Sequence, residues 1–80
     1  MKISPRKISQ IRFERFSEGL SAQIMHVGPY SEETESLNRL HQAIREKGYR
    51  MRGRHHEIYL SDPGKVLPSQ LHTILRQPVE

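Results

Sequence analysis

The sequence predicts an α+β fold: a single β-β-α-β-β module, an antiparallel sheet with one main helix on one face. Four short segments, bounded by turn residues, have the alternation and composition of strands. One segment between the second and third strands has the apolar period of an amphipathic helix. The 80 residues suffice for one domain, and the sequence contains no internal repeat that would divide them. We expect residues 1–10 to be a flexible or weakly helical lead and residues 11–80 to form the module.

The four strands are predicted from alternation and from the residues that end each run. The first covers 11–16 and the second 20–27, with turn residues between them and Gly28-Pro29 after them. The third covers 55–61 and ends at Asp62-Pro63-Gly64. The fourth covers 71–77 and ends at Pro78. Edge strands of such a sheet leave main-chain groups unpaired, so they can pair with another chain.

The helix is the most clearly marked element. Ser31 is expected as its N-cap, and acidic residues in the first turn suit the helix dipole. Gly48 is expected just past its end, after the basic residues of the last turn. The apolar stripe that should pack on the sheet consists of Leu37, Leu40 and Ile44.

The composition suggests that the module is stabilised by association. Only 34% of the residues are hydrophobic, and there is no Trp and no Cys. Small scaffolds usually need disulfides, a metal or oligomerisation, and the missing Cys excludes disulfides and thiolate zinc sites. We therefore expect a homodimer, with the second copy related by a two-fold axis.

Charge and hydropathy limit the partners. No apolar run follows the charged N-terminus, so we expect no signal peptide or membrane segment and a cytoplasmic location. The net charge of +4 is spread along the chain, although Arg50, Arg52 and Arg54 lie close together. The sequence has no recognition-helix, ring-stacking or zinc-finger motif, so we expect no direct binding of nucleic acid.

The third strand carries the residues best suited to chemistry. Alternation places Ile58 and Leu60 on one face and Glu57 and Tyr59, with His55, on the other. We expect the Ile58 face to pack on the helix and the Glu57 face to point away from it. A carboxylate beside a phenol can bind a cation or polarise water if a cavity covers it. The alternative is a solvated carboxylate beside a surface tyrosine.

The histidines do not have the spacing of metal ligands. The side chains of His55 and His56 diverge on a strand, and His26, His41 and His72 belong to different elements. We expect no metal and no cofactor, and we expect His26 to be a hydrogen-bonded interior or groove residue. There is no Gly-rich phosphate loop and no recognisable pair of nucleophile and base.

Several blocks, in order, resemble the GyrI-like small-molecule-binding domains over about residues 11 to 79. The most specific block is His55-His56-Glu57-Ile58-Tyr59-Leu60-Ser61-Asp62-Pro63. The other blocks are Glu18-Gly19, Gln23-Ile24-Met25-His26-Val27-Gly28-Pro29-Tyr30, Gly48-Tyr49 and Thr73-Ile74-Leu75-Arg76-Gln77-Pro78-Val79.

The resemblance implies a ligand-binding module with a groove. Members of the family contain two β-β-α-β-β modules around a pseudo-two-fold axis, and this chain resembles the C-terminal half-module. The family binds hydrophobic, often cationic and aromatic molecules, with an acidic residue in the groove that Glu57 matches. We therefore expect a sensor or sequestering protein whose groove forms by homodimerisation. Its ligand-binding residues would be Glu57, Tyr59, His26, Tyr30 and His55.

The resemblance also implies two alternatives. Relatives include hydrolases that open the cyclopropane of DNA-alkylating natural products, in which a groove glutamate positions or activates water. On that alternative Glu57 would be the catalytic acid or base, and Tyr59 would orient it. The other alternative is a non-catalytic partner subunit that pairs with a longer GyrI-like chain.

Overall fold

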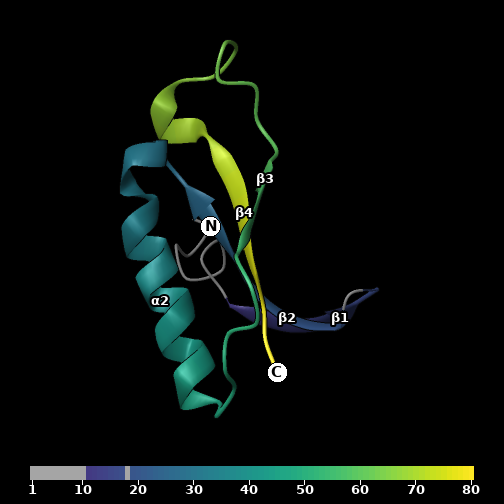
Figure 1. The fold of residues 1–80 in the computed structure, drawn as a ribbon. Helices are drawn as coiled ribbons and strands as arrows, with labels where there is room; N and C mark the ends of the chain where they lie inside the picture. The colour runs from purple at the N-terminus through teal and green to yellow at the C-terminus, as the bar shows by residue number, and fades with distance from the viewer. Residues whose placement is uncertain (1–10, 18) are drawn as a thin grey trace, which may run out of the picture.

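An antiparallel sheet and one long helix make up the fold of the computed structural model, which describes residues 11–17 and 19–80 (Figure 1). The strands are β1 (Arg12–Phe16), β2 (Gly19–Val27), β3 (His56–Tyr59) and β4 (His72–Pro78), and the helix is α2 (Glu33–Glu46). Two 3-10 turns, η1 (Tyr30–Glu32) and η2 (Pro68–Gln70), precede α2 and β4. The strand order is β1-β2-β4-β3, and all neighbours are antiparallel. The predicted α+β class is thus confirmed, whereas the expected lead over residues 1–10 lies outside the described residues.

The helix ends as predicted but begins differently. Gly48 has a φ of +84°, its N–H donates to Arg45 O, and the Tyr49 N–H donates to Ile44 O. These are the two bonds of a Schellman C-cap. Ser31 is not the N-cap, because it lies inside η1 and makes no capping hydrogen bond. The Gly28-Pro29 turn starts η1 with a bond from Glu32 N to Pro29 O, and α2 continues directly from that turn.

The core lies between the helix and the two central strands. Ile24 of β2 and Leu75 of β4 meet Leu40 and Ile44 of α2, and each of these side chains is at most 1% exposed. The helix packs mainly against β2 and runs along one face of the sheet (Figure 1). Partly buried side chains complete this core: Ile11, Phe13, Leu20 and Leu37.

The register of β3 overturns the predicted orientation of its side chains. Leu75 of β4 lies opposite both Ile24 of β2 and Glu57 of β3, and directly paired residues point to the same face of a sheet. Glu57 and Tyr59 therefore face the helix side of the sheet. The expectation that Ile58 and Leu60 pack on the helix is wrong.

The physical reason is the place of β3 in the sheet. A single helix covers only the central strands. The helix-side face of an edge strand is therefore not buried by the helix and can carry polar side chains. Ile58 instead lies in a row with Ile74 and Met25 on the opposite face, here called the far face. Leu60 is 53% exposed.

Among the described residues, no helix is long and apolar enough to cross a membrane.

Candidate functional site

The Glu57 carboxylate accepts a hydrogen bond on each of its oxygens. The Tyr59 hydroxyl donates to Oε1 at 2.6 Å, and His55 Nε2 lies 3.2 Å from Oε2. Glu57 and Tyr59 alternate on one face of β3, and His55 directly precedes that strand, so local chain geometry brings the three residues together. About a third of the Glu57 and His55 side chains is exposed, which leaves the group open to a ligand.

These hydrogen bonds favour the ionised form of Glu57. The bond from Tyr59, and then the bond from His55, lower the pKa of Glu57 below its ordinary value. The same bond raises the pKa of Tyr59 to about 12. A phenolate could no longer donate a hydrogen bond to Glu57, and its negative charge would lie beside that of the carboxylate. Glu57 is therefore an anion at neutral pH, and Tyr59 is a neutral donor.

Tyr30 adds an aromatic ring to this group. Its ring meets the Tyr59 ring edge-on, with the centroids 5.4 Å apart and the planes at 68°. Tyr30 belongs to η1, so the turn before the helix reaches over the edge strand. Both rings are substantially exposed, at 40% for Tyr30 and 58% for Tyr59. Glu57, Tyr59, His55 and Tyr30 are called the Glu57 cluster below.

His26 is an interior residue that supports the turn carrying Tyr30. It is 4% exposed, and its Nε2 lies 2.9 Å from Pro29 O. A carbonyl oxygen only accepts, so Nε2 carries a proton. Nδ1 lies 2.8 Å from the Ser36 hydroxyl oxygen, within hydrogen-bond distance. His26 thus links β2, η1 and the first turns of α2, as the expectation of a hydrogen-bonded interior residue had it.

Glu33 and Thr73 are two polar residues beside the cluster that the sequence did not single out. Glu33 is 8% exposed and Thr73 is 0% exposed. Burial, followed by the charge of Glu57, raises the pKa of Glu33, whereas His26 and His55 lower it. A signal for Glu33 did exist, because it extends the stripe of Leu37, Leu40 and Ile44 by one turn. Because Glu32 and Glu35 are also glutamates near the helix start, the sequence does not distinguish Glu33 from them.

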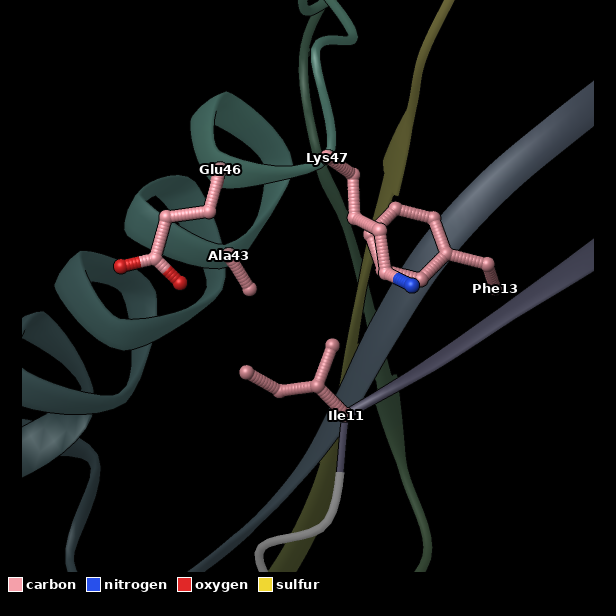
Figure 2. A pocket seen from close by; sticks show the side chains of 5 residues that line it. All are labelled: Ile11, Phe13, Ala43, Glu46 and Lys47. Carbon is pink, nitrogen blue, oxygen red and sulfur yellow. The ribbon is translucent and has the colours of Figure 1, made fainter.

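Two hollows lie away from the Glu57 cluster. One, of about 460 Å³, opens between the C-terminal end of α2 and the start of β1, and the side chains of Lys47 and Phe13 are among those that line it (Figure 2). The other, of about 360 Å³, lies on the far face, where the Arg76 guanidinium stacks 3.8 Å from the centre of the Phe16 ring. Neither is lined by a residue of the predicted site.

The comparisons with known proteins agree with this architecture. The family model of the GyrI-like small-molecule-binding domain matches residues 2–80, and the chain belongs to this family. No protein of curated function matches the chain.

Solved structures from Listeria innocua match the chain closely. A hydrolase is 45% identical with a TM-score of 0.76, and the match covers 81% of this chain and 35% of the other. An uncharacterized conserved protein is 49% identical, also with a TM-score of 0.76, over 84% of this chain and 35% of the other. This chain therefore spans about a third of the length of these relatives.

Proposed function

We propose that this chain binds small aromatic cations at the Glu57 cluster, with Glu57 as the anionic partner and Tyr59 and Tyr30 as the aromatic surface. The observation that carries the proposal is the doubly hydrogen-bonded Glu57 carboxylate next to two exposed tyrosine rings. An ionised carboxylate attracts a ligand cation, and the faces of tyrosine rings attract it as well. Pro29 and His26 hold the turn that carries Tyr30.

We propose further that a second copy completes the groove along β3. Leu60 N donates to His72 O, which places Leu60 and Ile58 in the hydrogen-bonded pairs with β4. The main-chain groups of Glu57 and Tyr59 then point to the outer edge, where no strand of residues 11–17 and 19–80 pairs with β3.

The symmetry of that pairing would form the groove. Antiparallel pairing of β3 with its copy has a two-fold axis perpendicular to the sheet, so both helices stay on one face. The two Glu57 clusters would then line the floor between the helices. This arrangement would give each ligand two aromatic surfaces from an aromatic inventory of only two Phe and three Tyr per chain.

Binding of phenyltrimethylammonium, followed by calorimetry, tests the first proposal. Glu57→Gln keeps the shape of the side chain and removes its charge, and we expect it to weaken binding about tenfold or more. Glu14→Gln, on the opposite edge strand β1, is the matched control and should leave the affinity within about twofold. Equal affinity in the wild type and Glu57→Gln would refute Glu57 as the anionic partner.

Hydrolysis of a strained electrophile is the second candidate, and the hydrolase from Listeria innocua favours it. In that reaction Glu57 would accept a proton from water as the water oxygen bonds to a cyclopropane carbon. The ring C–C bond breaks, and its electron pair passes to a conjugated carbonyl oxygen, which is then protonated. The lowered pKa of Glu57 makes it a weak base, so cation binding ranks first. Turnover of such a substrate that is lost in Glu57→Gln would reverse this ranking.

A further inference from the structure

Two buried oxygen atoms beside the Glu57 cluster have no hydrogen-bond partner among residues 11–17 and 19–80. They are Glu33 Oε2 and Thr73 Oγ1. Each belongs to a side chain that is more than nine-tenths buried. Buried polar atoms in folded proteins are nearly always paired, so these two unpaired atoms call for an explanation.

Both atoms lie where the first turn of α2 meets the sheet. Thr73 of β4 pairs with His26 of β2 on one side and with Tyr59 of β3 on the other, so its side chain lies between theirs on the helix-side face. Glu33 begins α2 directly after η1, which carries Tyr30. The charge of Glu57 acts on the Glu33 carboxyl, so the two carboxyl groups lie near one another.

The neighbours of these atoms do not supply the missing partners. His26 uses both ring nitrogens, on Ser36 and on Pro29. Tyr59 gives its only proton to Glu57. His55 uses Nε2 toward Glu57, and Glu57 itself only accepts when ionised. The unpaired Glu33 oxygen therefore needs a donor from outside these residues, and the Thr73 hydroxyl, which can donate or accept, has no partner among residues 11–17 and 19–80.

A protonated nitrogen with N–H groups on an aromatic framework has the matching chemistry. An amidinium or ammonium group offers several donors and a positive charge. Glu33 would accept one N–H and supply a negative charge, and Thr73 Oγ1 would accept another. The Tyr30 and Tyr59 rings next to them would contact the aromatic framework.

We propose that Glu33 and Thr73 form a second polar subsite that takes the N–H groups of an aromatic amidine or amine. The inference rests on the proposed function, because it assigns a further contact to the same ligand. A cation beside Glu33 favours its ionised form, so binding lowers the pKa that burial raises. The affinity for the amidine or amine then rises with pH across the titration of Glu33. The titratable groups near Glu33 are Glu57, Tyr59, His26 and His55.

The experiment compares two probes of equal charge, benzamidine and phenyltrimethylammonium, of which only benzamidine carries N–H donors. Titration calorimetry in two buffers with different ionisation enthalpies counts the protons released. The variants are Glu33→Gln, Thr73→Val and the control Glu35→Gln, an exposed glutamate in the same helical turn. We expect Glu33→Gln and Thr73→Val to weaken benzamidine binding about tenfold and about fivefold, respectively. We expect phenyltrimethylammonium binding to stay within about twofold.

At a pH within the titration of Glu33, proton release on benzamidine binding should occur in the wild type and in Glu35→Gln and be absent in Glu33→Gln. Retained binding of phenyltrimethylammonium shows that each variant is folded. If both probes depend on Glu57 but not on Glu33 or Thr73, the inference is overturned and the proposed function stands. If the wild type binds neither probe, both are overturned.

Discussion

The hydrogen bond from Tyr59 to Glu57 couples the titrations of two side chains. Its length of 2.6 Å is typical of a hydroxyl that donates to a carboxylate. The bond lowers the pKa of Glu57 and raises that of Tyr59 to about 12. A change in either residue should therefore shift the pKa of the other.

Removal of the Tyr59 hydroxyl should raise the pKa of Glu57 toward its ordinary value. Tyr59→Phe deletes the donor that contributes most to the shift and keeps the ring against Tyr30. Carbon NMR of the Glu57 carboxyl against pH measures this change. Conversely, Glu57→Gln should bring the pKa of Tyr59 from about 12 toward 10, as ultraviolet absorbance of the phenolate would show. Tyr49→Phe, whose ring packs on Phe13 away from the cluster, is the control.

The raised pKa of Glu33 predicts that the contribution of this residue to the stability of the fold falls with rising pH. Below the pKa of Glu33 in the unfolded chain, both states are protonated and burial of the carboxyl carries no charge penalty. As the pH rises through the raised pKa of the folded state, the unfolded chain has already ionised and the folded state loses stability. Urea unfolding of Glu33→Gln should therefore show a gain over the wild type at neutral pH that disappears in acid. A gain of equal size at both pH values would contradict this assignment.

At the scale of elements, one helix stripe holds α2 on the sheet. Leu40 and Ile44 are at most 1% exposed and meet Ile24 and Leu75 of the central strands. The Schellman cap at Gly48 ends the helix and turns the chain toward β3. The helix position bears on the proposed site, because its first turn carries Glu33 and the preceding turn carries Tyr30.

Truncation of the buried stripe should cost far more than truncation at the helix start. Leu40→Ala removes a fully buried side chain, and we expect a loss of about 2–5 kcal/mol in the free energy of unfolding. Ser31→Ala should change it by less than about 0.5 kcal/mol, because Ser31 is exposed and makes no cap. Urea denaturation of the two variants measures both values. A loss above 1 kcal/mol for Ser31→Ala would restore its role as a cap.

For Gly48, the backbone conformation sets the expected cost. Its φ of +84° is one that side chains rarely adopt, although no atom lies within 4 Å of an added Cβ. Gly48→Ala should therefore destabilise the chain by about 1 kcal/mol through backbone strain alone. Thermal unfolding of this variant beside the wild type gives the value.

At the scale of the whole molecule, the outer edge of β3 is where the proposed pairing with a second copy would take place. β3 presents the main-chain groups of Glu57 and Tyr59 outward, next to the same residues' side chains on the helix side. A second copy paired along this edge would complete the sheet and the groove together. A partner chain with a similar edge would serve equally, as the partner-subunit alternative requires.

Pairing along β3 should protect the Glu57 and Tyr59 amides from hydrogen exchange as the protein concentration rises. The Ile58 amide is the internal control, because the register places it in a bond with β4 at any concentration. Sedimentation over the same range should show the monomer mass give way to that of a dimer. Monomeric protein with unchanged exchange at the highest concentration would refute the homodimer and direct the search to a partner chain.

The sequence by itself determined the type and order of the elements and the composition of the cluster. Alternation put Glu57, Tyr59 and His55 on one face, because that relation depends only on the two-residue period of a strand. The helix stripe and the Gly48 stop were equally local. The blocks shared with the GyrI-like family led to the prediction that Glu57 binds the ligand.

Only the tertiary structure decided which face of β3 meets the helix side and what joins it there. Local alternation cannot distinguish the two faces of a strand, and Ile58 seemed the natural partner of the helix. The order β1-β2-β4-β3 put β3 at an edge that one helix does not cover, so its polar face lies on the helix side. The same packing buried Glu33 and Thr73, which are 40 residues apart in the chain, beside Glu57. Such a juxtaposition arises from strand register and helix docking, and these are fixed only when the whole chain packs.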